Sequence, residues 1–387
     1  MRILLTTDAV GGVWDYATTL QRRLVERGDH VLLAVLGRPT SDRIAALAPG
    51  ADWVARPFPL EWDEGGVQAI ERAARWIAEL ADRMRADVVH LNQLTYAHLL
   101  RHPVLTVVHS DAWSWFVEVR GSTPDGEPRW CAYRDAVVRG LEASDLVVTP
   151  SRYQARLVER QYGRRVDHVV RNGVDRESFA RRPAPPEPAP AGPTSFVTIG
   201  RAWDPAKGLA VVDEALELVR APWAGYHAGD LEGPEHQRMV PRRLRALGRL
   251  PRHGIRQLLG RSSVYVAASY YEPFGLAPLE AAMSGCALVL ADIGSFRELW
   301  DGDALYFNRG DAASLARALD RLHADPKLHH DLRLRAMQRA WSRFDDRQMA
   351  ARYARLYETL RAGAPEGRER AAVRRSDPQR TAPRISP

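Results

Sequence analysis

The sequence predicts an α/β protein with two Rossmann-like domains that face a cleft. Apolar, strand-like runs alternate with helical patterns from the first residues onward, which is typical of parallel sheets covered on both faces. A proline-rich stretch interrupts this alternation and carries six prolines in the thirteen positions 181–193. The alternation then starts again and continues to about residue 320. Two similar domains joined by a linker leave a cleft between them, where ligands usually bind.

The first predicted domain covers residues 1–178. Strand-like runs lie at 2–6 and 30–36, and the helical pattern between them, at 14–27, ends at Gly28. Four further apolar runs are strand candidates: 87–91, 104–109, 145–149 and 166–171. Helical patterns lie between several of these runs, as a parallel sheet requires.

The remainder of the chain divides into a linker, a second domain, a helix and a tail. Residues 179–194 form the predicted linker, because so many prolines argue against a helix or a central strand. The second domain covers 195–343 and restarts with a strand at 195–199. A last helix is predicted at 344–362. The tail, 363–387, contains six arginines and three acidic residues without apolar periodicity, and we expect it to be disordered and basic.

Composition argues against several classes of protein. Of 387 residues, 45% are hydrophobic and 27% charged, which is ordinary for a globular protein. No apolar run approaches the roughly 18–20 residues that span a bilayer, and the first run is too short for a signal peptide. Cys131 and Cys286 alone favour neither a disulfide framework nor a cysteine-rich metal site.

These properties predict a cytoplasmic protein that binds no nucleic acid. The net charge of +7 belongs in part to the basic tail. It leaves open a weak peripheral contact with anionic lipid at the inner face of the membrane. Nothing in the sequence indicates an oligomeric state.

The segment YYEPFGLAPLE, residues 270–280, places two carboxylates where a strand gives way to a helix. Pro278 suits the first turn of that helix, and Gly275 lets the backbone approach a ligand closely. The first amides of a helix have no carbonyl partners within it and form an anion site suited to phosphate. Glu272 and Glu280 repel a phosphate, so they are better used to accept hydrogen bonds from sugar hydroxyls.

Two cations follow the first strand of the second domain. Arg201 can donate two parallel hydrogen bonds to phosphate oxygens. Lys207, one of only two lysines, can contribute a single positive charge at the end of a flexible side chain. A nucleotide sugar would use all these groups, because its diphosphate lies between the hydroxyls of a sugar and those of a ribose. Each group alone also fits a structural role: solvated bases on a loop, and acids that complement a helix dipole or face water.

Taken together, these residues resemble the retaining glycosyltransferases of family 4, which have the GT-B fold. The resemblance covers about residues 1–362. It rests on the Arg201 and Lys207 pair, on the E-x7-E motif with Pro-Phe-Gly-Leu inside it, and on DAVGGVW, VVHSD and RNGVD in the first domain. It implies that the last helix crosses back onto the first domain. We expect neither a metal nor another cofactor, because Arg201, Lys207 and a helix N-terminus can meet the charge of the leaving diphosphate.

The resemblance also implies a role for each site residue. Arg201 and Lys207 would hold the donor diphosphate, Glu272 would bind the donor sugar, and Glu280 the ribose. His109 would lie over the donor sugar at the reaction centre. The other donor-binding positions implied are Gly12, Phe274, Gly275 and Leu276.

The predicted function is therefore the transfer of a sugar, with retention, from a nucleoside-diphosphate sugar to a hydroxyl. The acceptor would be a glycan, a lipid-linked molecule or a small molecule. Arg201 and Lys207 stand six positions apart, whereas the family commonly spaces them by five. Four aromatic residues either stack on an acceptor sugar or pack beneath a loop: Trp113, Trp115, Phe116 and Trp130.

Alternatives remain open at this point. A nucleotide-sugar epimerase of GT-B fold would share the diphosphate site but would need acid–base groups that the sequence does not identify. A nucleotide-sugar-binding protein without turnover would keep the same residues. A metal-dependent transferase would use a D-x-D pair, which Asp301 and Asp303 match by spacing. A pyridoxal-phosphate phosphorylase would need a Schiff-base lysine, and neither Lys207 nor Lys327 has a suitable context.

Overall fold

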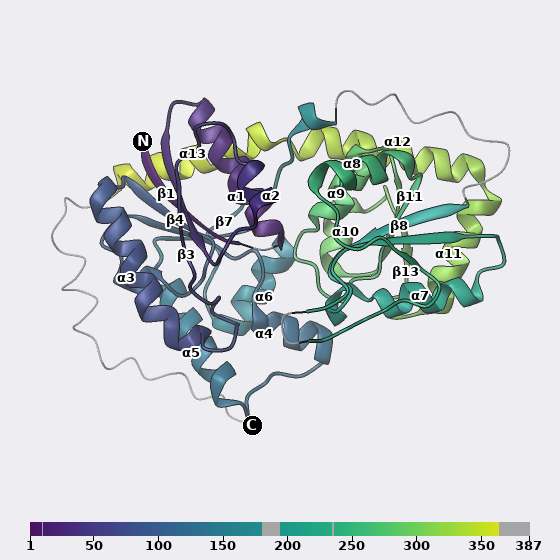
Figure 1. Cartoon of the computed structure of the whole chain (residues 1–387), viewed down its shortest axis with the longest axis horizontal. Helices are drawn as coiled ribbons and strands as arrows, with labels where there is room; N and C mark the ends of the chain where they lie inside the picture. Colours follow the sequence, from purple (N-terminus) through teal and green to yellow (C-terminus); the bar gives the residue numbers. More distant parts are fainter. Residues whose placement is uncertain (10, 180–193, 234–235, 364–387) are drawn as a thin grey trace.

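The computed structural model describes residues 1–9, 11–179, 194–233 and 236–363 (Figure 1). Two α/β domains, each built on one parallel sheet, confirm the predicted fold class. Nearly all of the predicted linker and of the predicted basic tail lies outside the described residues. Within these ranges, none of the helices combines the length and the apolar character needed to cross a bilayer.

Seven parallel strands form the sheet of the first domain, in the order β3-β2-β1-β4-β5-β6-β7. The strand bounds are β1 Arg2–Asp8, β2 His30–Leu36, β3 Trp53–Arg56, β4 Val88–Leu91, β5 Val104–Val107, β6 Leu146–Thr149 and β7 His168–Val169. The helices are α1 Gly11–Glu26, α2 Ser41–Ala45, α3 Gly66–Met84, α4 Ala112–Trp115, α5 Pro128–Ala143 and α6 Arg152–Tyr162. The sequence did not predict β3, because this edge strand is short and none of its residues is buried.

The sheet of the second domain has six parallel strands in the order β10-β9-β8-β11-β12-β13. The strand bounds are β8 Ser195–Ile199, β9 Ala224–Ala228, β10 Arg245–Ala246, β11 Val264–Ala267, β12 Ala287–Ala291 and β13 Leu305–Phe307. The helices are α7 Leu209–Leu218, α8 Arg252–Arg261, α9 Leu276–Met283, α10 Gly294–Trp300, α11 Ala312–Ala324 and α12 Pro326–Arg343. Every residue of β11 and β12 is buried, as expected for strands that are covered on both faces.

The last helix, α13 (Asp346–Ala362), follows the second domain in the chain but packs on the first, as predicted (Figure 1). Its apolar face joins the hydrophobic core that contains α1 and β1. Tyr353 and Tyr357 are fully buried there, and the Tyr357 hydroxyl lies 2.6 Å from Nδ1 of His90 on β4. The core of the first domain is therefore completed by residues far along the chain.

The chain crosses between the domains twice in the described residues, and the two crossings touch. Val174 on the first crossing pairs with Asp345 on the second in a parallel bridge. Gly173 allows this approach, because a Cβ at this position would lie 2.6 Å from the backbone of Asp345. We call this meeting point, residues 171–179 and 343–347, the hinge.

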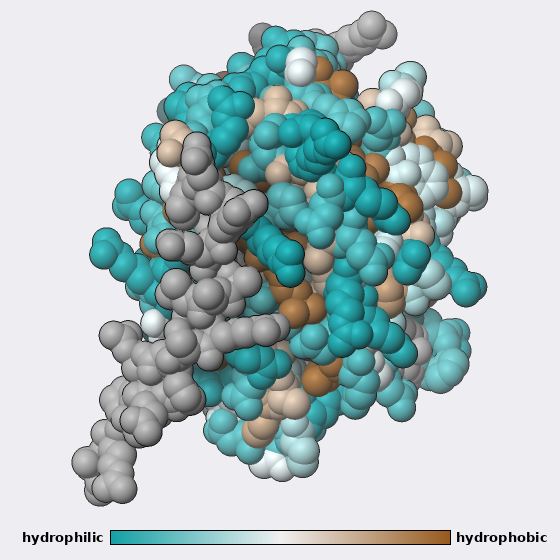
Figure 2. Space-filling view, turned by 90° about the vertical axis from the view of Figure 1, so that its left-hand side faces the viewer, coloured by the Kyte–Doolittle hydropathy of each residue, from teal (hydrophilic) through white to brown (hydrophobic). Residues whose placement is uncertain are grey.

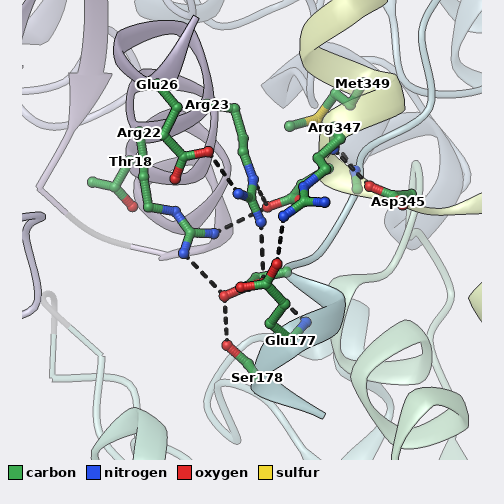
Figure 3. Close-up of polar contacts among 12 residues, drawn as sticks. Thr18, Arg22, Arg23, Glu26, Glu177, Ser178, Asp345, Arg347 and Met349 are labelled. Atoms are coloured by element: carbon green, nitrogen blue, oxygen red, sulfur yellow. Dashed lines mark hydrogen bonds and ion pairs between the residues drawn. The ribbon is translucent and has the colours of Figure 1, made fainter. Parts of the chain in front are cut away.

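Two arginines of α1 form ion pairs with both segments that cross between the domains (Figure 3). Arg22 contacts Asp175 and Asp346, each at 3.0 Å. Arg23 contacts the same two carboxylates, at 3.2 Å and 2.9 Å. The side chains of Arg23 and Asp346 are 6% and 1% exposed, so this pair is shielded from water. Because unpaired charges are costly in such a place, the four groups stabilise the hinge only as a set.

We expect the substitution Asp346→Asn to lower the free energy of unfolding by about 3 kcal/mol, the scale for removing one partner of a buried ion pair. The change removes the most deeply buried of the three carboxylates that contact Arg23, and Asp175 and Glu26 remain. Chemical denaturation at pH 7 measures the effect. The matched control is Glu358→Gln, which removes an exposed partner of Arg27 and should cost under about 1 kcal/mol. Equal effects of the two substitutions would contradict a structural role for Asp346.

Candidate functional site

The E-x7-E segment lies, as predicted, between a buried strand and a helix. β11 ends at Ala267, and α9 begins at Leu276. Gly275, just before α9, has a φ of 88°, which favours glycine. A Cβ there would also lie 3.3 Å from Cγ of Glu272 and 3.2 Å from Cγ of Pro278. A side chain at this position would therefore disturb both the turn and Glu272.

The residues on either side of Gly275 have different roles in packing. The ring of Phe274 is buried and packs edge-on against Phe344, with ring centroids 5.7 Å apart. Only the backbone of Phe274 is thus available to a ligand. Leu276 points across the cleft, because a Cβ on Gly12 would lie 3.2 Å from its Cδ1. The first turn of α1 in one domain therefore lies beside the first turn of α9 in the other.

The structure brings together Lys207 and Glu272, which the sequence placed on separate loops. Lys207 closes a short 3₁₀ helix after β8, and its Nζ lies 2.6 Å from Oε2 of Glu272. Their side chains are 25% and 19% exposed, so the pair is neither fully buried nor freely solvated. The aliphatic stem of Lys207 passes over Gly200, where a Cβ would touch it at 3.4 Å. The pair joins the ends of two neighbouring strands, β8 and β11.

Arg201 lies on the loop before Lys207 and is about half exposed. Its Nη2 contacts Oδ2 of Asp204 at 2.7 Å. Asp204 also accepts hydrogen bonds from the amide of Ala206 and, at 3.2 Å, from the indole of Trp115 in the first domain. Asp204 thus ties the loop that carries both cations to the opposite domain.

Glu280 faces two residues that the sequence analysis did not identify. Arg252, the first residue of α8, contacts Glu280 at 3.5 Å and Asp15 on α1 at 2.8 Å. Burial raises the pKa of Glu280; Arg252 partly offsets this effect, and Asp15 adds to it. Asp15 and Arg252 stand 237 positions apart, so no local pattern marks them as partners. The Arg252 side chain joins the two domains at the Glu280 side of the cleft.

His109 follows β5 and is held in a defined protonation state. Asn92 donates through Nδ2 to the carbonyl of Thr6 at 2.7 Å, which turns its Oδ1 toward Nε2 of His109 at 3.0 Å. Nε2 must therefore carry the proton, and Nδ1 is left as an acceptor. Burial lowers the pKa of His109 to about 3, so the ring is neutral at physiological pH. The ring of Tyr16 packs edge-on against it, with centroids 4.3 Å apart.

The first domain also supports the loop that carries Glu272. Ser151, at the start of α6, donates a hydrogen bond to the carbonyl of Pro273 at 2.6 Å. In return, Glu298 on α10 accepts hydrogen bonds from the amides of Arg152 and Tyr153 at 2.9 Å and 2.8 Å. A carboxylate from the second domain thus satisfies the first amides of α6, where negative charge is favourable.

The D-x-D pair does not form a joint site in the structure. Asp303 is paired with Arg339, and Asp301 lies 3.5 Å from Arg297. Among the described residues, no group of three or more His, Cys, Asp or Glu side chains is arranged to hold a metal ion. Independence from metal stays a prediction.

The four aromatic residues considered for the acceptor side mostly pack on one another. Trp113 is buried in the core. Phe116 lies between Trp115 and Trp130, with ring centroids 5.2 Å and 4.9 Å away. These contacts favour packing beneath the loop over an open surface for sugar stacking.

Comparison with known proteins gives one family match for each domain. Residues 10–178 match the family described as "Glycosyltransferase Family 4", and residues 193–325 match "Glycosyl transferases group 1". The glycogen synthase of Mycobacterium tuberculosis is 31% identical over 219 residues, which are 53% of this chain and 51% of that protein. The phosphatidyl-myo-inositol mannosyltransferase of Mycolicibacterium smegmatis is 29% identical over 373 residues, 86% of this chain and 89% of that protein. The chain thus spans about half the length of the glycogen synthases that it matches.

Solved structures share the whole architecture. Sucrose-phosphate synthase from Thermosynechococcus elongatus has a TM-score of 0.78 at 18% identity, covering 94% of this chain and all of that one. Anabaena HepE, solved in complex with UDP and glucose, has a TM-score of 0.71 at 18% identity, over 93% of this chain and all of that one. These similarities establish the GT-B arrangement of the two domains.

The raised pKa of Glu280 leads to a prediction about stability and pH. A carboxyl whose folded pKa lies above its unfolded value costs stability as pH rises from the unfolded value, about 4.5, through the folded one. As the pH rises from 4.5 to 7, we expect the free energy of unfolding to fall less for Glu280→Gln than for the wild type. Denaturation at several pH values measures this. The exposed control Glu214→Gln should follow the wild type. A parallel pH profile for Glu280→Gln would contradict the raised pKa.

Proposed function

We propose, from the premise that this chain is a glycosyltransferase with the GT-B fold, that it moves a sugar from a nucleoside-diphosphate sugar to a hydroxyl. We further propose that the anomeric configuration is retained and that no metal takes part. One of the related folds was solved with UDP-glucose, which supports a nucleotide sugar as donor. The similarity to a phosphatidyl-myo-inositol mannosyltransferase over most of the chain supports a polyol or lipid-linked acceptor.

The observation that carries this proposal is the contact between Lys207 and Glu272 at 2.6 Å. An arriving diphosphate competes with Glu272 for the Lys207 ammonium, because both are anions. When Lys207 turns to the phosphate, Glu272 is released to accept hydrogen bonds from hydroxyls of the donor sugar. Donor binding thus exchanges one anionic partner of Lys207 for another, and Glu272 exchanges its ion pair for hydrogen bonds from sugar hydroxyls.

The departing nucleoside diphosphate gains negative charge in the transition state. Groups that already point at this charge lower the barrier most, because they need not reorganise. In the proposal, the first amides of α9 already point at this charge, and Lys207 and Arg201 reach it once the bound diphosphate has drawn them from Glu272 and Asp204. Glu280 would hold the ribose hydroxyls, with Arg252 fixing its carboxylate.

His109 suits the sugar side of the site because its ring is neutral. With the proton on Nε2 directed to Asn92, Nδ1 can accept a hydrogen bond from a hydroxyl of the donor sugar. Retention then follows if the acceptor attacks on the face that the diphosphate leaves, and the departing phosphate oxygen takes the acceptor's proton. The C–O bond to phosphate breaks as the new glycosidic bond forms, so charge and atoms balance.

A cytoplasmic location remains part of the proposal, with weak peripheral contact at the inner face of the membrane. The acceptor class supports it, because a lipid-linked hydroxyl would be met at a membrane surface. The enzyme would not bind nucleic acid.

We expect Lys207→Ala to reduce turnover by roughly 10²–10³, the scale for losing one preorganised donor to a developing negative charge. Initial rates with a nucleotide sugar chosen by thermal-shift screening measure this. The control is Lys327→Ala, the other lysine of the chain, which is exposed on α12 and should leave the rate unchanged. EDTA should change the wild-type rate by less than about twofold. Loss of activity in EDTA, restored by Mn²⁺ or Mg²⁺, would overturn metal independence.

We expect the first product formed to keep the anomeric configuration of the donor. NMR spectra of early reaction mixtures, recorded before any spontaneous anomerisation, distinguish the two outcomes. An inverted anomer would contradict retention. A new nucleotide sugar formed without any acceptor would instead indicate an epimerase. Donor binding without hydrolysis or transfer would indicate a binding protein.

A further inference from the structure

A cationic pocket lies at the hinge, and neither Lys207 nor Glu272 is among its lining residues. It has a volume of about 240 Å³ and is lined by Arg171, Ser342, Arg343, Asp345, Gln348 and Arg352, beside Met349. Pockets for drug-sized ligands usually measure about 300–1,000 Å³, so this one fits a smaller molecule. Two of the lining residues, Asp345 and Met349, are labelled in Figure 3.

Charge in this pocket is strongly one-sided. Arg171, Arg343 and Arg352 form no ion pair with a carboxylate anywhere in the described part of the chain. The pocket's single acid, Asp345, is already engaged: Oδ2 contacts Arg176 at 2.8 Å, and Oδ1 accepts the amide of Arg347 at 2.7 Å. Burial lowers the pKa of Arg171; the charge of Glu298 partly offsets this effect, and the positive charges of Arg343, Arg352 and Arg152 add to it.

The three arginines come from three different segments. Arg171 precedes the first crossing, Arg343 ends α12 in the second domain, and Arg352 lies on α13. Arg343 and Arg352 are exposed and Arg171 is half-buried, so water partly screens the repulsion among the three charges, and an anion that bridges them would relieve it. On the α1 side of the hinge, the carboxylates of Asp175 and Asp346 neutralise the charges of Arg22 and Arg23. On the pocket side, the charge of Glu298 acts on Arg171 without a direct ion pair, and no described carboxylate pairs directly with Arg343 or Arg352.

We infer that this hinge pocket binds a phosphate group, as inorganic phosphate or as a small phosphate monoester. The planar guanidinium group of arginine is positively charged and can donate two parallel hydrogen bonds to phosphate oxygens. Ser342 and Gln348 add uncharged polar groups at the rim. A bound phosphate joins Arg171 to Arg343 and Arg352, and so links both crossings between the domains. This site is independent of the donor site in the proposed function.

Isothermal titration of the full chain with inorganic phosphate tests the inference, at a constant ionic strength set with chloride. A second titration uses glycerol 3-phosphate, which separates free phosphate from a monoester as the preferred form. We expect saturable binding that Arg352→Gln weakens at least tenfold, the scale for losing one charge-assisted contact. The matched control is Arg355→Gln, an exposed arginine three residues along the same helix that does not line the pocket. It should bind within about twofold of the wild type.

Phosphate could instead occupy the donor site, and two readouts separate the cases. Lys207→Ala should keep the binding if the hinge pocket is the site. Hydrogen exchange should slow at residues 172–175 and 343–349 when phosphate is added. The inference is overturned by the absence of saturable binding, by equal losses in Arg352→Gln and Arg355→Gln, or by binding that Lys207→Ala removes.

Discussion

The ion pairs between α1 and the hinge are the constraint on which the cleft depends. Two segments distant in sequence must cross between the domains side by side, and each brings a carboxylate into a poorly solvated place. Arg22 and Arg23 satisfy both carboxylates at once, so neither crossing can shift without exposing a buried charge. α1 also begins at the cleft, near Leu276. One helix therefore connects the position of the hinge to the geometry of the site.

The cleft is assembled by contacts that alternate between the domains. Trp115 of the first domain holds the loop of Arg201 and Lys207 through Asp204. Ser151 holds the backbone next to Glu272. Arg252 of the second domain reaches Asp15 of the first. These are single hydrogen bonds and partly exposed ion pairs, each worth about 1 kcal/mol or less. Each of these contacts is therefore easier to break than the hinge network, in which Arg23 and Asp346 are buried.

The parts of this protein that follow a local rule could be predicted from its sequence. Alternating strands and helices, the glycine before α9 and the apolar face of α13 each reflect a short-range pattern. Asp15 and Arg252 could not be found in this way, because their contact is created by the relative position of two domains. The ring of Phe274 belongs to the core although its backbone borders the site, a distinction that spacing does not contain. The edge strand β3 was missed because no buried face marks it.

The place of α13 has a consequence for the order in which this protein can fold during synthesis. The core of the first domain needs Met349, Tyr353 and Tyr357, which leave the ribosome only after the whole second domain. Until then, α1 and β4 expose the apolar surface that α13 will cover, including the edge of His90. The second domain has a separate core and can fold before that moment. In this chain, the domain made first is therefore the one completed last, and its apolar surface stays uncovered until α13 has been made.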